Sequence, residues 1–129
     1  MSPIRDVVAA QRALDALITG DGRAAVDQFT EDVVLTGSGG CLDGHTTGLA
    51  EVIDRFADMS LLTNGTFGTE VEAVYAGSSS MLVVVTRNWA AVGGIQVHGT
   101  QALVVTVLGD RIRAIDVLSR PGPASGIWD

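Results

Sequence analysis

Two long apolar runs joined by a pair of glycines dominate residues 81–107, MLVVVTRNWAAVGGIQVHGTQALVVTV. Runs of this kind predict two antiparallel strands, and a Gly-Gly pair suits a two-residue hairpin turn that needs positive φ. A turn at Gly93-Gly94 places Val92 opposite Ile95. This one pairing sets the register of the whole predicted ladder.

The register gathers several polar and aromatic side chains on one face of the hairpin. Trp89 lies opposite His98, and Arg87 lies opposite Thr100, on an otherwise apolar surface. The other face takes Asn88, Thr86, Gln101 and Leu103. An aromatic ring, an imidazole and a guanidinium at one end of an apolar surface are typical of a pocket lining, although a partly wet outer surface also shows them.

The rest of the chain predicts further helices and strands on either side of the hairpin. In chain order they begin with a helix that starts at Ile4 and ends near Gly20, a helix capped by Asp21 and closed by Thr30-Glu31-Asp32, and a strand at Val33–Thr36. They continue with a brief strand or turn at Leu42–His45, a helix capped by Thr47 and ending at Asn64-Gly65, and strands at Thr66–Tyr75 and Ile112–Ser119. We expect a single domain over residues 1–129, with a loosely structured tail at 121–129.

Composition excludes several classes of partner. The chain of 129 residues has a net charge of −7, and it contains no lysine and no Arg cluster. Nucleic acid and anionic membranes are therefore not expected partners, and no run approaches the roughly 20 apolar residues of a membrane span. A single cysteine predicts no internal disulfide and a cytoplasmic location. The hydrophobic content of 47% suggests that both sheet faces are covered, which favours self-association.

Turns, caps and core positions along nearly the whole chain carry a family resemblance. They include Gly20-Asp21-Gly22, Phe29–Val34, Leu42-Asp43-Gly44 and Gly109–Ile112. With these residues the chain resembles the SnoaL-like and ketosteroid-isomerase-like branch of the nuclear transport factor 2-like superfamily. The resemblance implies an α+β cone, in which a strongly curved mixed, mainly antiparallel sheet wraps three N-terminal helices around an apolar cavity. It also implies homodimers formed through the outer sheet face.

The family includes enzymes whose site residues are absent here. Ketosteroid isomerases have a general-base aspartate that would fall near Gly37 and a second aspartate near Gln101 or Ala102. Limonene-type epoxide hydrolases need Arg and Asp two residues apart, whereas Arg87 is followed two residues later by Trp89. The fold is therefore specified better than the activity.

The predicted catalytic residues are His98, Arg87 and Asp116. In an apolar cavity a neutral His98 could carry a proton, and Arg87 could hold an oxyanion or carboxylate. Asp116 resembles the acid of SnoaL-type cyclases if a bulge turns it inward. The alternative is a rim histidine, an outward interface arginine and an exposed aspartate.

The predicted substrate-binding residues are Trp89, Tyr75, Gln11, Phe56 and Thr100. Trp89 and Tyr75 could instead serve packing, and the amide of Gln11, which interrupts an apolar helical stripe, could instead bind neighbouring backbone. We expect no metal, because Cys41-x-Asp43-x-His45 is not a recognised ligand spacing. We also expect no cofactor.

Two functions of different classes follow. The first is cofactor-free acid/base chemistry, a cyclisation or isomerisation, on an apolar oxygenated natural-product intermediate such as a polyketide. The second is a non-catalytic module of the same fold that binds a small apolar ligand or dimerises. Epoxide hydrolase-like or dehydratase chemistry is a further alternative.

Overall fold

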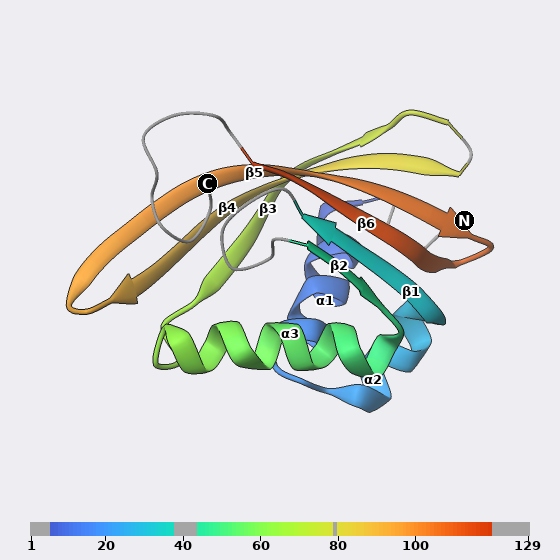
Figure 1. The fold of residues 1–129 in the computed structure, drawn as a ribbon. Helices are drawn as coiled ribbons and strands as arrows, with labels where there is room; N and C mark the ends of the chain where they lie inside the picture. The colour runs from blue at the N-terminus through green and yellow to red at the C-terminus, as the bar shows by residue number, and fades with distance from the viewer. Residues whose placement is uncertain (1–5, 38–43, 79, 120–129) are drawn as a thin grey trace.

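The computed structural model describes residues 6–37, 44–78 and 80–119, which form three helices and six strands (Figure 1). In chain order the elements are α1 (Val7–Ile18), α2 (Gly22–Gln28), β1 (Phe29–Gly37), β2 (Gly44–Thr47), α3 (Leu49–Leu62), β3 (Gly68–Ala76), β4 (Met81–Val92), β5 (Ile95–Leu108) and β6 (Arg111–Ser119). The predicted order of two helices, two strands, a helix and four strands is confirmed.

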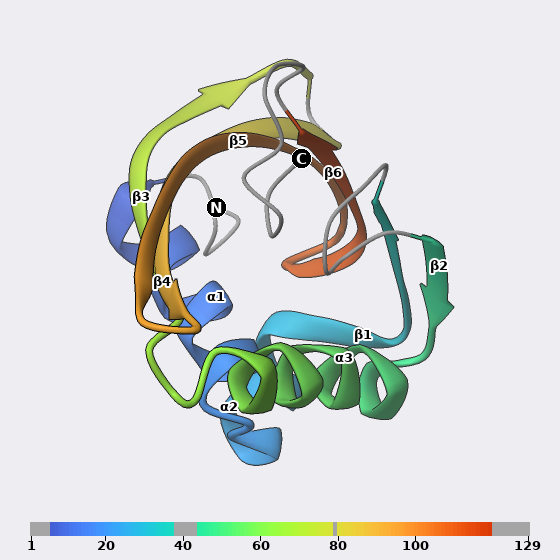
Figure 2. The same ribbon diagram turned by 60° about the vertical axis from the view of Figure 1, so that its left-hand side comes forward.

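The described strands form one sheet in the order β2-β1-β6-β5-β4-β3. Neighbouring strands are antiparallel, except that β1 and β6 run parallel. Figure 2 shows the sheet bending through a wide arc, with α3 lying across the open side between its two edges. The predicted α+β fold, with a curved and mainly antiparallel sheet around the helices, is confirmed.

The hairpin of β4 and β5 has the predicted register. Val92 and Ile95 pair next to the turn, and the ladder then continues in step along both strands. Gly93 and Gly94 have φ values of 58° and 83°. Two successive positive φ values are what a type I′ turn requires, and a β-carbon disfavours them.

β3 contains a bulge at Glu72. Its pairing with β4 passes from Val71 opposite Thr86 directly to Ala73, which leaves Glu72 without a partner strand residue. An extra residue in one strand reverses the alternation of side chains beyond it. Val71 therefore faces the core while Tyr75 is 61% exposed, although strict alternation along the predicted strand Thr66–Tyr75 would place both on one face.

The core lies between the concave face of the sheet and the helices α1 and α3. Both helices bury one stripe of side chains at the predicted 3.6-residue spacing. The buried residues of α1 are Ala10, Ala13, Leu14, Ala16 and Leu17, and those of α3 are Leu49, Val52, Phe56 and Met59. The three alanines leave little bulk between α1 and its neighbours, so the helix packs close to β3.

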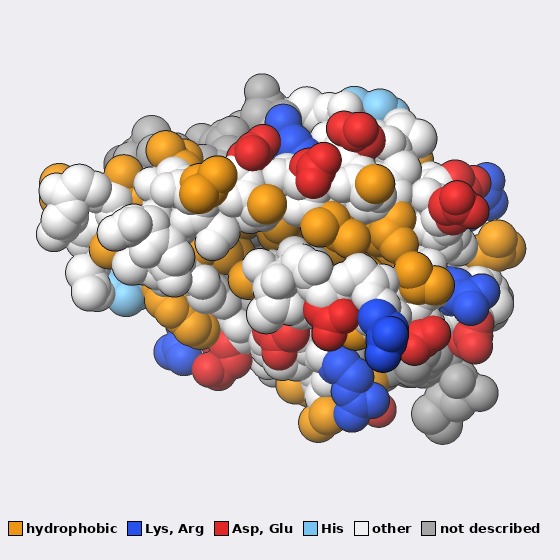
Figure 3. Space-filling model, turned by 90° about the horizontal axis from the view of Figure 1, so that it is seen from below, with side chains coloured by type: hydrophobic (Ala, Val, Ile, Leu, Met, Phe, Trp, Pro, Cys, Tyr) orange, Lys and Arg blue, Asp and Glu red, His pale blue; other side chains and the backbone are white. Residues whose placement is uncertain are grey.

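Apolar side chains remain exposed on the helical side of the molecule. Val26 on α2 is 56% exposed, and Leu61 and Leu62 at the end of α3 are 80% and 58% exposed. Figure 3 shows apolar side chains in a band across this side, with acidic side chains on both sides of the band. The helical layer therefore does not present a uniformly polar surface.

Two predicted helix boundaries are wrong. α2 ends at Gln28, because Phe29 takes an extended conformation with φ −126° and ψ 150° and already begins β1. α3 is preceded by Gly48 at φ 99° and has no side-chain cap, whereas the predicted cap, Thr47, is the last residue of β2.

The predicted cap of α2 is confirmed, since the Asp21 carboxylate accepts a hydrogen bond of 3.1 Å from the backbone N–H of Ala24. Cys41, Asp43 and the tail at 121–129 lie outside the described residues.

α3 ends in a Schellman motif built on an asparagine. The backbone N–H of Gly65 donates to the carbonyl of Ser60 at 2.8 Å, and that of Asn64 donates to the carbonyl of Leu61 at 3.1 Å. Asn64 holds a φ of 53°. In this left-handed conformation a β-carbon is strained, although asparagine tolerates it better than most residues.

Replacing Asn64 by glycine should raise the free energy of unfolding by roughly 0.5 kcal/mol, because relief of strain exceeds the added entropy of the unfolded chain. Asn64→Ala should lower it by about 1 kcal/mol, because alanine has no side chain that tolerates this conformation. Urea denaturation of the three proteins measures both changes, and three equal midpoints would contradict the assignment.

Candidate functional site

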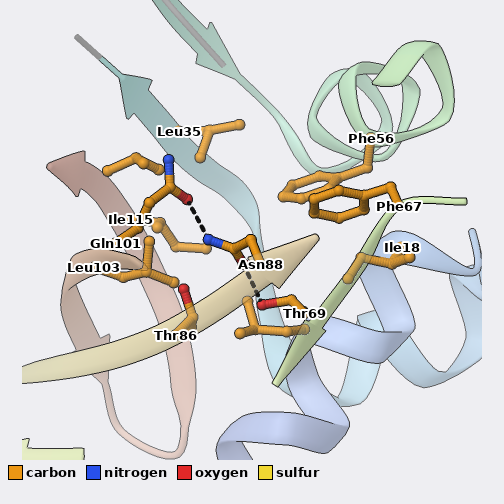
Figure 4. Close-up of a pocket in the computed structure, with 12 residues that line it drawn as sticks. Ile18, Leu35, Phe56, Phe67, Thr69, Thr86, Asn88, Gln101, Leu103 and Ile115 are labelled. Atoms are coloured by element: carbon orange, nitrogen blue, oxygen red, sulfur yellow. Dashed lines mark hydrogen bonds between the residues drawn. The ribbon is translucent and has the colours of Figure 1, made fainter. Parts of the chain in front are cut away.

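A small cavity lies between the concave face of the sheet and the helices. Its volume is about 30 Å³. Figure 4 shows Phe56 and Phe67 on one side of it and the strand side chains on the other. The wall residues are Leu14, Ile18, Leu35, Phe56, Phe67, Thr69, Thr86, Asn88, Gln101, Leu103, Ile115 and Val117. No described wall residue has a titratable side chain, and the polar ones are two hydroxyls and two amides.

Three of these polar side chains form a chain of hydrogen bonds across β3, β4 and β5 (Figure 4). The Thr69 hydroxyl donates to Asn88 Oδ1 at 2.6 Å, and Asn88 Nδ2 donates to Gln101 Oε1 at 3.1 Å. Asn88 is 2% exposed and Gln101 is 7% exposed. Buried amides are normally hydrogen-bonded, so this chain stabilises the polar groups inside an apolar interior.

The sequence pattern favours the face with Trp89 and His98 as the pocket lining and puts Asn88 and Gln101 on the opposite face, whereas the structure has the reverse. Inward side chains of β4 include Leu82 and Val84, and outward ones include Val83 and Val85. Because both faces begin with similar aliphatic residues, alternation alone does not distinguish them. The available signal was Arg87, since an unpaired guanidinium is far more costly to bury than an amide.

The predicted cluster around His98 lies on the outer face of the sheet. His98 and Thr100 are exposed, and Trp89 is 37% exposed. Arg87 Nη2 lies 3.2 Å from Glu70 Oε2, and both side chains are more than half exposed. The interpretation of this face as the cavity lining is therefore corrected. The catalytic roles of His98 and Arg87 are untested and stay predictions.

Asp116 also lies on the outer face. It pairs with Val104, which itself pairs with Val83 on that face, and its side chain is exposed. A bulge does occur in β6, where Arg113 is the extra residue, but it precedes Asp116 and leaves it outside. The Asp116 side chain is therefore directed away from the cavity, and its acid/base role is likewise untested and stays a prediction.

Trp89 has a structural position that depends on a glycine. Gly68 pairs directly with Trp89 across β3 and β4, and a β-carbon on Gly68 would overlap the indole ring. The ring therefore lies over the backbone of the edge strand. This contact covers the glycine with aromatic surface, which favours the packing interpretation of Trp89.

Gln11 and Phe56 are predicted ligand-binding residues with different outcomes. Phe56 is 6% exposed and forms part of the cavity wall. Gln11 instead binds the free edge of β3, where its Nε2 donates to the Thr69 carbonyl at 3.0 Å and its Oε1 accepts from the Val71 N–H at 2.7 Å. One side chain thus makes the pair of hydrogen bonds that a neighbouring strand would make, as the backbone-binding alternative predicts.

Among the described residues there is no group of three or more His, Cys, Asp or Glu that could hold a metal ion. His45 lies on β2 between two hydroxyls, with Nδ1 at 3.2 Å from Thr36 Oγ1 and Nε2 at 3.4 Å from Thr47 Oγ1. In the described part of the chain no helix is long and apolar enough to cross a membrane.

The sequence matches no protein-family model and no curated protein. Solved structures with this architecture do match. Bal32a, from a soil-derived mobile gene cassette, has a TM-score of 0.76 at 20% identity, over 84% of this chain and 84% of that one. A protein with a ketosteroid isomerase-like fold from Catenulispora acidiphila, in complex with trimethylamine, has a TM-score of 0.71 at 13% identity, over 92% and 86% of the two chains.

The chain has the nuclear transport factor 2-like fold. A protein from Acidithiobacillus ferrooxidans that is proposed to be a polyketide cyclase also shares it, with a TM-score of 0.69 at 13% identity over 86% and 84% of the chains. At such identities the nuclear transport factor 2-like fold is what is common, because one fold carries many activities.

Replacing Gln11 by methionine should lower the free energy of unfolding by about 1–3 kcal/mol, because it removes both hydrogen bonds at the edge of β3. Urea denaturation measures this loss. Arg12→Met, on the exposed side of α1, serves as the control and should leave the stability unchanged. Equal stability of wild type and Gln11→Met would contradict the assignment.

Proposed function

We propose that this protein binds a small uncharged organic molecule in the cavity and carries out no proton transfer there. The observation that supports this most directly is the wall composition, which combines apolar side chains with the neutral chain of Thr69, Asn88 and Gln101. Small-molecule sites typically combine an apolar lining with a few placed polar groups. Cyclisation, isomerisation or dehydration would need a titratable group at the cavity, and no described wall residue has one.

The size of the cavity restricts the ligand. A volume of about 30 Å³ holds roughly two water molecules, so a compact molecule fits with modest movement of the walls. A polycyclic intermediate would require displacement of Phe56 and Phe67. The trimethylamine complex of the Catenulispora protein supports the same scale of ligand for this fold.

The enzyme hypothesis is the second candidate, because one structural neighbour is proposed to be a polyketide cyclase. It gives a different expectation for His98. If His98 carries a proton, His98→Ala abolishes turnover, whereas in the binding proposal the same variant leaves ligand affinity unchanged. We rank binding first because His98 is exposed on the outer face.

Filling the cavity should prevent binding. Val117, which is 2% exposed, lines the cavity, so Val117→Leu adds a methylene group to its wall. We expect this variant to bind isobutene more than about tenfold more weakly than wild type, because little space remains. Chemical shifts in methyl NMR spectra measure the affinity.

Val26→Leu is the matched control, since it adds the same group at an exposed position of α2 and should bind as wild type does. Equal isobutene affinity in wild type and both variants would exclude this cavity as the binding site.

We also propose that a second copy of the chain covers the outer sheet face in the cytoplasm. The centre of this face is aliphatic and half-buried in the monomer, and Tyr75 and Leu118 at 61% and 45% exposure extend it. The central residues are Val83, Val85, Ala102 and Val104. Apolar patches of this kind mark interaction sites, and the same surface on two copies is self-complementary in a twofold dimer.

Val85→Lys should raise the dimer dissociation constant by roughly two orders of magnitude, because it places an unpaired charge at the centre of the interface. Sedimentation velocity over a concentration series measures the constant. Ala57→Lys, on the exposed side of α3, is the control and should sediment as wild type does. A wild-type protein that remains monomeric throughout the series would refute the dimer.

A further inference from the structure

We infer that the cavity selects ligands that accept a hydrogen bond, such as small ketones, ethers or sulfoxides, and that Gln101 supplies the donor. This inference rests on the proposed binding function and specifies the chemistry of its ligand. It depends on the direction of the hydrogen-bond chain through Thr69, Asn88 and Gln101.

Two directions are chemically possible for this chain. In one, the Thr69 hydroxyl donates to the oxygen of Asn88, whose nitrogen then donates to the oxygen of Gln101. In the other, both amides are rotated, so that the nitrogen of Gln101 donates to Asn88 and the nitrogen of Asn88 donates to Thr69. The two directions leave opposite groups of Gln101 unused, a donor in the first and an acceptor in the second.

The separations select the first direction. Thr69 Oγ1 and the Asn88 atom that faces it are 2.6 Å apart, which lies within the range of about 2.5–3.0 Å for an O–H···O bond and below the range of about 2.7–3.2 Å for N–H···O. The atom of Asn88 toward Thr69 is therefore oxygen. The nitrogen of Asn88 then faces Gln101 at 3.1 Å, a normal N–H···O length.

The amide nitrogen of Gln101 consequently has no partner within this chain of hydrogen bonds. Figure 4 shows the Gln101 oxygen directed at Asn88 and the nitrogen turned away from it. Gln101 is 7% exposed, and its described hydrogen bond is the one through its oxygen. Among the described residues, the buried side-chain atoms without a hydrogen-bond partner are Gln28 Oε1 and Thr30 Oγ1. The Gln101 nitrogen therefore keeps some accessible surface, through which it can donate to an acceptor on a ligand. The hydroxyl of Thr86, also in the wall, can donate or accept and so does not discriminate.

Thr69 acts as a positioning residue for this donor. Thr69 does not contact Gln101 directly. Its hydroxyl fixes the oxygen of Asn88, and Asn88 in turn bonds to Gln101. Its backbone is held in turn, because its carbonyl accepts a hydrogen bond of 3.0 Å from Gln11 Nε2. Without the Thr69 hydroxyl, the amides of Asn88 and Gln101 should therefore be free to adopt either direction of the hydrogen-bond chain.

Three neutral probes of similar size test the inference on the full-length protein. Acetone accepts a hydrogen bond, isobutene has its shape without an acceptor, and pyrrole offers an N–H donor. We expect wild type to bind acetone roughly 3- to 10-fold more tightly than isobutene, as one net hydrogen bond allows. Acetone, and not isobutene, should shift the side-chain ¹H–¹⁵N signals of Gln101.

Two variants isolate the donor from the cavity. Gln101→Met should abolish the preference for acetone, so that the ratio of acetone affinity to isobutene affinity falls to about one, because it removes the donor at similar length. Thr69→Val should also reduce the preference and change the Gln101 side-chain signals, whereas Thr69→Ser should preserve both. If Gln101→Met does not fold, the comparison of Thr69→Val with Thr69→Ser still decides the matter.

The outcomes separate the two proposals. Pyrrole bound more tightly than acetone, or equal affinities for acetone and isobutene in wild type, would overturn the acceptor inference and leave the cavity as a binding site. Failure of all three probes to bind wild type would overturn the proposed function itself.

Discussion

Consecutive residues of a strand point to opposite faces of a sheet, so β4 cannot bury both Arg87 and Asn88. A guanidinium needs a charged partner and several hydrogen bonds to be buried, whereas an amide needs only a few neutral partners. Arg87 accordingly remains half exposed against Glu70, and Asn88 lies at 2% exposure between Thr69 and Gln101. Because the register of the hairpin is set, this choice determines which face every other side chain of β4 and β5 takes.

The same choice leaves no titratable side chain among the described residues of the cavity wall. With His98, Arg87 and Asp116 on the convex face, the cavity wall keeps amides and hydroxyls as its polar groups. Such groups orient a ligand through hydrogen bonds and do not change protonation near pH 7. The fold is shared with proteins named for chemistry, and the proposed role of this cavity is recognition.

Two local features protect the free edge of the sheet at β3 from pairing with another strand. Gln11 occupies the backbone groups of Thr69 and Val71, and the bulge at Glu72 then interrupts the regular edge. Free strand edges promote pairing with other chains, and side-chain caps and bulges oppose it. Gln11 also connects this edge to the cavity, since Thr69 belongs to both.

The sequence by itself determined the order of the elements, the glycine turn and the full register of the hairpin, because these depend on local periodicity and on the positive φ of Gly93 and Gly94. It also contained Phe56 as a wall residue, since helical spacing places it inward. Only the tertiary structure decided which sheet face is concave. Both faces of β4 begin with aliphatic or methionine side chains. A bulge such as that at Glu72 also reverses the alternation of side chains beyond it without a sequence signal. The packing of α1 and α3 against one face supplied the asymmetry that alternation lacks, and it placed Thr69, Asn88 and Gln101 in the cavity wall.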